Sequence, residues 1–180
     1  LAPTVKQLTD GRWRMYFESR GPAQVPPVIT SAISSNGLDW ELEEGARVEG
    51  FDGIGAPRFL PLPDGRGRLY CFATEYDEEG RAGGNKISQS VISAITTDGL
   101  NFEFEPGYRM KDGQSEIEAK GITAGDVLPP SSDGEPWRML YSGWQDAPPG
   151  SNIPPHPSDP DADHSVLAED FAAASIRVDL

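Results

Sequence analysis

Two short patterns recur along this chain, and their recurrence constrains the fold more than any other feature. The first pattern is an apolar strand, an Asp-Gly turn and a second apolar strand, and it occupies residues 2–18, 56–73 and 124–142. The second pattern is also strand, turn and strand, and residues 29–47 align without a gap with residues 91–109. Self-similarity of this kind is the sequence signature of repeat architectures.

Because the two patterns alternate, one unit holds four antiparallel strands. Successive units start 54 and 68 residues apart, which is typical of β-propeller blades. We predict an all-β fold, a β-propeller of four-stranded antiparallel blades, over residues 1–50, 54–112 and 121–180, the last incomplete. About two and a half blades are present, and a propeller closes only with about four to eight. The chain 1–180 is therefore predicted to be a partial propeller domain, a fragment. The alternative, a β-sandwich, gives no reason for the same turn chemistry to repeat at matching offsets.

The turns and the second strand of each unit support this prediction. Asn-Gly and Asp-Gly are preferred centres of tight hairpins, because both central residues need φ > 0. These dipeptides occur at Asn36-Gly37 and Asp98-Gly99 in the second pattern. In residues 12–17 and 138–141 apolar residues dominate both faces. We expect this strand to be sandwiched between neighbouring blades.

Composition narrows the classes of partner and site. The chain has 20 Gly and 17 Pro, which fits many short strands joined by turns, and its formal net charge of −14 repels phosphate backbones. We therefore expect no nucleic-acid partner. The single cysteine, Cys71, excludes an internal disulfide and a multi-Cys zinc site, and its apolar neighbours predict that it is buried. No stretch approaches the roughly 18 apolar residues of a membrane span.

The position of the first residue leaves localisation open. The sequence starts at Leu1, without a Met and without a visible signal peptide. A secreted protein and a cytoplasmic one are both compatible with this sequence.

The repeats resemble the blades of the five-bladed propellers of the glycoside hydrolase superfamily that includes arabinanases, invertases and β-mannoside phosphorylases. They also resemble the sialidase-like BNR repeat proteins. The resemblance rests on the strand starts 2–5 and 56–59, the strand 13–16 and the hairpin 35–40. It implies a carbohydrate-active propeller that acts on or binds glycans at its central funnel, without a cofactor. The alternative is a non-catalytic propeller that binds glycans or proteins.

The hairpin at 35–40 also resembles the Asp-box of sialidases, but one residue is missing before its Gly. We assign its Ser, Asn and Asp side chains to stabilising the turn, and Trp40 and Phe102 to packing inward. The motif is therefore expected to maintain the fold and not to contact a substrate.

The resemblance places ligand-contacting side chains at the beginnings of the innermost strands, where the glycosidases carry an Asp just before a Pro. This chain has Ala2 and Ala56 before its prolines, and Ala124 at the matching position of the third unit. The expected carboxylates are thus absent from these units, and it stays open whether the protein is an enzyme.

Nearby positions differ between the units and offer other candidates. Thr4, Arg58 and Asp126 occupy variable positions within a constant framework. Arg58 can bind a carboxylate or a sugar hydroxyl through its planar guanidinium, and Asp126 is the predicted catalytic base. Glycosidases use two carboxylates about 5–9.5 Å apart, so Glu118, in the acidic segment before the third unit, is the predicted partner of Asp126. The alternatives are a structural Arg–Asp pair across the funnel and, for Glu118, a solvated loop.

The ends of the second strands supply weaker substrate-binding candidates. Glu18 and Glu75 end equivalent strands, and Trp144 ends the third. An aromatic side chain at a funnel rim suits stacking on a sugar ring, and core packing is the alternative.

A Pro/Asp-rich insertion loop is predicted over residues 146–165. It contains both histidines, His156 and His164. Its Asp residues stand at every second position, as the ligands of a calcium-binding loop do. The residues in question are Asp159, Asp161, Asp163 and His164. The Gly and the closing Glu of a calcium loop are absent, so Ca²⁺ is conceivable there but no metal site is predicted. We interpret the segment as a surface insertion.

Overall fold

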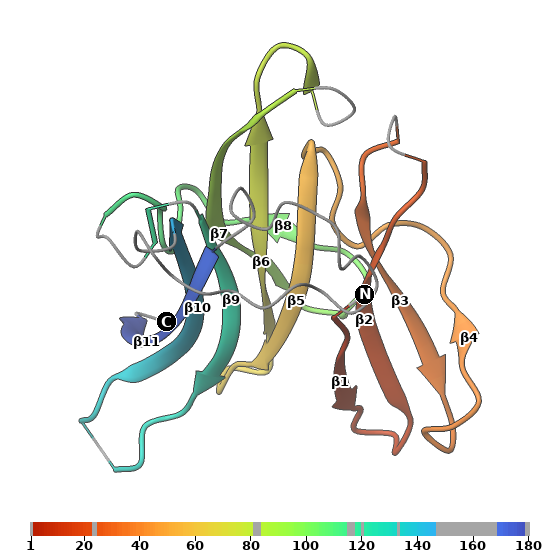
Figure 1. Cartoon of the computed structure of the whole chain (residues 1–180). Helices are drawn as coiled ribbons and strands as arrows, with labels where there is room; N and C mark the ends of the chain where they lie inside the picture. Colours follow the sequence, from red (N-terminus) through yellow and green to blue (C-terminus); the bar gives the residue numbers. More distant parts are fainter. Residues whose placement is uncertain are drawn as a thin grey trace.

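The computed structural model describes residues 2–22, 25–80, 84–114, 118–119, 121–132, 134–146 and 169–178. The fold is all-β, and its strands form three antiparallel sheets that lie side by side (Figure 1). The first sheet contains β1 (Thr4–Gln7), β2 (Trp13–Ser19), β3 (Val28–Ser34) and β4 (Glu41–Leu42). The second contains β5 (Gly53–Pro61), β6 (Gly67–Tyr76), β7 (Lys86–Thr96) and β8 (Glu103–Phe104). The third contains β9 (Gly121–Leu128), β10 (Trp137–Asp146) and β11 (Glu169–Val178).

Each sheet is a meander in which strands adjacent in sequence are paired. The strand orders are β1-β2-β3-β4 and β5-β6-β7-β8 in the first two sheets, and β11-β10-β9 in the third. The registers correspond, because Trp13 lies opposite Ser34, Gly67 opposite Thr96 and Trp137 opposite Val178. The predicted four-stranded repeat is therefore confirmed in two sheets and for the three described strands of the third.

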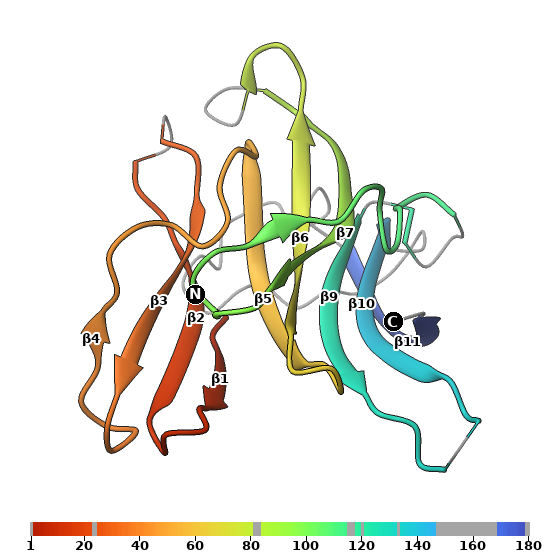
Figure 2. The same cartoon turned by 180° about the vertical axis from the view of Figure 1, so that it is seen from behind.

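The first strands of the sheets are neighbours. β5 contacts both β1 and β9, and the sheets fan out from these strands (Figures 1 and 2). β1, β5 and β9 run in a similar direction, so that they begin at one end of the molecule, which is uppermost in Figure 1 and is called the upper end below. Side chains at the beginnings of these strands therefore share one end of the molecule.

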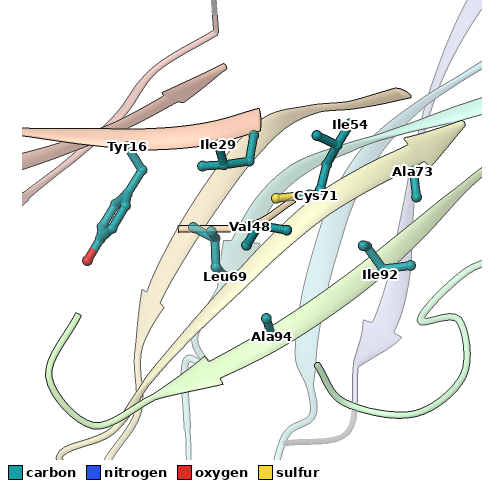
Figure 3. Close-up of a cluster of buried hydrophobic side chains, with 9 residues drawn as sticks. All are labelled: Tyr16, Ile29, Val48, Ile54, Leu69, Cys71, Ala73, Ile92 and Ala94. Atoms are coloured by element: carbon teal, nitrogen blue, oxygen red, sulfur yellow. The ribbon is translucent and has the colours of Figure 1, made fainter. Parts of the chain in front are cut away.

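Two apolar clusters fill the spaces between the sheets, and β6 contributes to both. Between the first and second sheets the cluster contains Tyr16, Ile29, Val48, Ile54, Leu69, Cys71, Ala73, Ile92 and Ala94 (Figure 3). Between the second and third it contains Leu60, Leu62, Tyr70, Val91, Met110, Ile122, Met139 and Tyr141. Burying a side chain such as Ile54 or Leu69 contributes about 1.5–3 kcal/mol. The expectation of a second strand sandwiched between blades is confirmed for β6, and Cys71 is buried as predicted.

β2 departs from that expectation because one of its faces is largely polar. Arg14, Tyr16 and Glu18 are buried against the second sheet, whereas Trp13 on the opposite face is only half-buried. Polar groups can be buried at this interface because each finds a partner. The prediction that apolar residues fill both faces of this strand is thus wrong for β2. It is also wrong for residues 138–141 of β10, where Met139 and Tyr141 are buried but Arg138 and Leu140 on the other face are exposed.

An ion pair supported by a serine repeats in the first two sheets. In the first, Arg14 Nε lies 2.9 Å from a carboxylate oxygen of Glu43, which also accepts a hydrogen bond of 2.7 Å from Ser31. In the second, Arg68 lies 2.7 Å from Glu105, which accepts a hydrogen bond of 2.6 Å from Ser93. Burial alone would raise the pKa of Glu105, but the hydrogen bonds from Ser93 and Arg68 outweigh it and hold this pKa below its usual value.

The turns use glycine differently from the prediction. Only the glycine of each pair is left-handed, with φ of 87° at Gly11, 76° at Gly37 and 74° at Gly99, so the expectation of two residues with φ > 0 is wrong. In the first turn Gly11 N donates to Leu8 O at 3.0 Å and Leu8 N donates to Arg12 O at 2.7 Å. This is a three-residue loop, in which a type I turn is followed by one left-handed residue.

In the turn of the second sequence pattern, an Asn or Asp side chain accepts the hydrogen bonds of the turn's backbone N–H groups. Oδ1 of Asn36, and equally Oδ1 of Asp98, accepts hydrogen bonds from the backbone N–H groups two and three residues further on. An amide–carboxylate pair then closes each turn: Asn36 donates to Asp39 at 2.8 Å, and Asn101 donates to Asp98 at 2.7 Å. The amide and the carboxylate have exchanged places between the two hairpins. The backbone N–H groups of Asn101 and Leu100 hold the pKa of Asp98 well below its usual range.

This exchange predicts that substituting one member of the amide–carboxylate pair destabilises the turn, and that exchanging both members together restores most of the stability. Asp98→Asn places two amides opposite each other and should lower the free energy of unfolding by about 1 kcal/mol. Asp98→Asn combined with Asn101→Asp recreates the first hairpin's arrangement and should recover most of that loss. Urea denaturation measures both, and a double variant no more stable than the single one would contradict the prediction.

The same pair gives a pH dependence. Because the pKa of Asp98 is lowered from its ordinary value of 3.8, its stabilising contribution is present above that value and is lost as the pH falls through the lowered pKa. The difference in stability between the wild type and Asp98→Asn, measured by urea denaturation across this range, should therefore shrink in strong acid.

Candidate functional site

A β-bulge interrupts β5, the first strand of the second sheet, at its middle. The register between β5 and β6 shifts between Gly55 and Arg58, so that Ala56 and Pro57 together lie opposite Cys71. Bulges bend a strand and re-aim its side chains, and they are over-represented next to active sites. Sequence reasoning missed this feature, although the Pro that follows Ala56 is compatible with an interrupted ladder.

The backbone at the bulge is strained, and the strain is repeated. Ala56 has a φ of 45° and Ala2, at the equivalent position, has a φ of 46°. A non-glycine residue pays about 1–2 kcal/mol for this left-handed conformation, and a residue that precedes Pro is normally extended. Such outliers persist only where their surroundings fix them, and they cluster at functional sites. These are the positions at which the resemblance placed an Asp.

A pocket of about 130 Å³ lies at the upper end, between the first and second sheets. Its lining combines polar and aromatic side chains with the start of β5. The lining residues are Glu18, Arg20, Pro27, Gly53, Ile54, Phe72, Thr74, Tyr76 and Gln89. The pocket thus joins the end of β2 to the beginning of β5 and the end of β6.

Two glycines at the beginning of β5 make room for the pocket's side chains. A Cβ at Gly55 would lie 2.4 Å from Oε2 of Glu18 and 2.6 Å from Cζ of Phe72. A Cβ at Gly53 would lie 2.8 Å from Cβ of Thr74. Glu18 is only 4% exposed and forms an ion pair with Arg20, whose side chain is half exposed. A buried carboxylate therefore lies against the bare backbone of the innermost strand.

The structure brings Arg58 into the same region as Glu18. Arg58 Nη1 donates to the carbonyl of Pro57 at 2.8 Å and to that of Ala2 at 3.4 Å, which links the middle of β5 to the residues before β1. Burial raises the pKa of the Cys71 thiol above its usual range, the charge of Arg58 lowers it and the charge of Glu18 raises it further. Two of the predicted binding residues, from different units, thus act electrostatically on one buried thiol.

Gln89 extends the pocket toward the third sheet. Its Nε2 donates to the carbonyl of Ile122 at 3.1 Å and to Thr123 Oγ1 at 3.4 Å, both at the beginning of β9. Its Oε1 accepts a hydrogen bond of 3.3 Å from Thr74. Sequence reasoning missed Gln89, because a glutamine in the middle of a strand gives no local signal of a contact between sheets.

Of the predicted catalytic carboxylates, Glu118 lies before β9 and Asp126 lies in the second half of that strand. The register between β9 and β10 shifts so that Gly125 and Asp126 lie opposite Leu140, and Asp126 is exposed within this second bulge. Glu118 precedes the strand and is 5% exposed, so the solvated-loop alternative does not describe it. Burial, and then the charge of Glu118, raise the pKa of Tyr141. That Asp126 and Glu118 act together stays a prediction.

The other predicted binding residues have separate surroundings. Glu75 is exposed and accepts hydrogen bonds from Ser88 at 3.2 Å and from the phenol of Tyr108 at 2.8 Å. The hydrogen bond to Glu75 raises the pKa of the Tyr108 phenol. Trp144 belongs to β10, but its side chain lies outside the described part of the chain, as do residues 147–165 of the predicted insertion loop with its candidate calcium ligands. Within the described ranges no three potential metal ligands gather.

The pocket can bind a small polar molecule. The carboxylate of Glu18 is a fixed hydrogen-bond acceptor, and the guanidinium of Arg20 is a hydrogen-bond donor. Thr74 and Gln89 can each donate and accept, while Phe72 and Tyr76 supply apolar surface. Among the described lining residues Glu18 is the sole carboxylate. Hydrolysis of a glycoside uses two carboxylates, so the pocket alone is equipped for binding, and a second carboxylate would have to come from elsewhere at the upper end.

The repeated four-stranded sheets, fanned around their first strands, define the β-propeller fold. Solved structures share it. They include a BT0996 RGII complex, with a TM-score of 0.64, 18% identity and coverage of 98% of this chain and 53% of that one. A thermostable family-43 glycoside hydrolase has a TM-score of 0.61, 14% identity and coverage of 96% and 49%. A Bombyx mori GH32 β-fructofuranosidase has a TM-score of 0.57, 11% identity and coverage of 98% and 34%.

The chain therefore has the fold of the five-bladed β-propeller glycoside hydrolases, as the repeats predicted. It spans about half the length of the first two structures. No family model and no curated protein matches the chain. Among the described residues no helix is long and apolar enough to cross a membrane.

The packing of Glu18 against Gly55 can be tested by filling the space. Gly55→Ala should displace the carboxylate and the Phe72 ring and lower the free energy of unfolding by about 1–3 kcal/mol. Glu18→Ala in the same chain removes one of the two clashes. The double variant should therefore be less destabilised than the sum of the single variants, as measured by thermal and urea denaturation. Strict additivity would show that the two residues do not touch.

Proposed function

We propose that this chain is part of a carbohydrate-active propeller that binds glycans at the upper end, in the pocket that contains Glu18. The observation that carries the proposal is the buried carboxylate of Glu18, ion-paired with Arg20 and packed against Gly55 where β5 begins. A fixed carboxylate accepts hydrogen bonds from neighbouring sugar hydroxyls without further loss of side-chain entropy. The glycoside hydrolase fold supports carbohydrate as the ligand class.

The rest of the pocket suits a sugar for the same physical reasons. Ligand sites combine apolar surface with a few fixed polar groups. Phe72 and Tyr76 provide aromatic surface for the C–H face of a ring, and Gln89 is held by hydrogen bonds at both ends of its amide. In this proposal Arg58 stabilises the site by joining the middle of β5 to the residues before β1, and reaches a ligand that extends along the first strands.

The second candidate function is hydrolysis of a glycosidic bond, and the likeness to glycoside hydrolases favours it. It needs a proton donor and a base or nucleophile. We propose Asp126 as the base, since the bulge of β9 leaves it exposed, and the buried Glu118 that precedes β9 as its partner. The alternative is a non-catalytic propeller, and the alanines at positions 2 and 56 support that alternative.

A binding experiment tests the first proposal. The chain is applied to a glycan array, and the Kd of the best ligand is measured by calorimetry. Glu18→Gln, which keeps the shape but removes the charge, should weaken binding about tenfold or more, because a hydrogen bond to a charged group contributes about 1.5–3 kcal/mol. Glu103→Gln, which makes the same change at an exposed carboxylate of β8, is the control, and it should change the Kd less than twofold. Equal effects of the two variants, at equal Tm, would count against the pocket.

Hydrolysis is tested separately with aryl glycosides. If the chain is catalytic, Asp126→Asn and Glu118→Gln should each lower kcat by about 10²–10⁴-fold, while glycan binding is retained. Hydrolysis that survives both substitutions removes these residues from the mechanism. Binding without detectable hydrolysis by the wild type supports the non-catalytic alternative.

A further inference from the structure

Three donors of the first sheet hold three consecutive carbonyls of the second sheet's hairpin. Arg14 Nη1 donates to the carbonyl of Asp98 at 3.2 Å, and the phenol of Tyr16 donates to that of Gly99 at 2.9 Å. Arg47 Nη1 donates to the carbonyl of Leu100 at 2.9 Å. The turn thus binds to the face of the preceding sheet through its backbone.

Glycine is required at the centre of this contact. A Cβ at Gly99 would lie 2.5 Å from Nη1 of Arg14 and 2.9 Å from the hydroxyl of Tyr16. The donors therefore recognise a turn with free carbonyls and no side chain at this position.

The second sheet carries the same three donors, but the described residues give them no turn to bind. Arg68 and Tyr70 occur 54 positions after Arg14 and Tyr16, and Arg109 occurs 62 positions after Arg47. Arg68 is held by Glu105 and Ser93 as Arg14 is held by Glu43 and Ser31, so its orientation is retained. Yet Nη1 of Arg68 and the hydroxyl of Tyr70 are buried without a hydrogen-bond partner in the part of the chain that the structure describes.

Unpaired buried donors cost free energy, so their presence points to an absent acceptor. A groove of about 360 Å³ lies beside them between the second and third sheets. It is lined by Leu62, Pro63, Asp64, Arg66, Arg68 and Trp137. The groove continues an established interface, because the turn of the second sheet lies against the equivalent Arg14 of the first.

We propose that Arg68, Tyr70 and Arg109 bind the backbone of a glycine-containing β-turn supplied by polypeptide that continues from β11. β11 is the equivalent of β7, since Val178 lies opposite Trp137 as Thr96 lies opposite Gly67. In the second sheet the turn follows Thr96 directly, so a turn that follows Val178 reaches the groove beside Arg68. Its carbonyls accept the bonds that Asp98, Gly99 and Leu100 accept in the first interface.

A pair of matched substitutions tests the proposal. The two tyrosine hydroxyls occupy equivalent positions, but among the described residues only that of Tyr16 has an acceptor. Tyr16→Phe should therefore lower Tm by about 2–4 °C, whereas Tyr70→Phe should leave Tm unchanged or raise it. A loss at Tyr70 as large as that at Tyr16 would overturn the proposal.

The second arm supplies the turn. In a lengthened chain, the residues after Val178 are replaced by a copy of residues 97–110, with a control copy in which its Gly99 is Ala. The lengthened chain should have a higher Tm than the original, and Tyr70→Phe should now lower Tm as Tyr16→Phe does. The control copy should give neither effect. A lengthened chain that is no more stable, or in which Tyr70→Phe stays neutral, overturns the proposal.

Discussion

Burial of β6 on both faces is the interaction on which the rest of this structure depends. Leu69, Cys71 and Ala73 pack toward the first sheet, and Tyr70 packs toward the third. Neither neighbouring sheet buries its second strand so completely, because Trp13 is half-buried and Leu140 is 45% exposed. A meander of this kind has two flat faces and gains most of its stability by covering both. The position of the pocket follows, since the contact between the first two sheets brings the end of β2 against the beginning of β5.

Polar groups give this packing its specificity. Apolar faces alone tolerate sliding and rotation, but Arg14 and Tyr16 accept a neighbour only where its turn presents carbonyls at the right spacing. The cost of leaving such groups unpaired makes any other arrangement unfavourable. The ion pairs of Arg14 with Glu43 and of Arg68 with Glu105 hold the donors in place. Hydrophobic burial therefore drives the sheets together, and the hydrogen bonds fix how they lie.

The sequence predicted the architecture well because the repeated features are local. The turn glycines, the alternating strands and the recurrence of Ser31 at Ser93 can all be recognised within a few residues, and the structure confirms the strands that they predict. The prediction failed where long-range contacts decide. The sequence did not predict that Arg14 and Glu18 are buried, or that Arg14 pairs with Glu43, which lies 29 residues further along the chain. The contact between Glu18 and Gly55 joins residues from different units, and no spacing rule reveals it. Arg58 and Asp126 could be identified as candidate site residues from the sequence, because their positions differ between units in which the surrounding positions are constant.

The bulges of β5 and β9 have a consequence for how side chains are distributed along a strand. In a regular strand, alternate residues face opposite sides, so neighbours in sequence never share a surface. One extra residue shifts this alternation by half a period. Beyond the bulge, β5 continues into the packed interior with Leu60, while before it Gly53 and Gly55 present bare backbone to Thr74 and Glu18. A single inserted residue thus lets the end of β5 pack into the interior while its first residues present bare backbone beside the pocket.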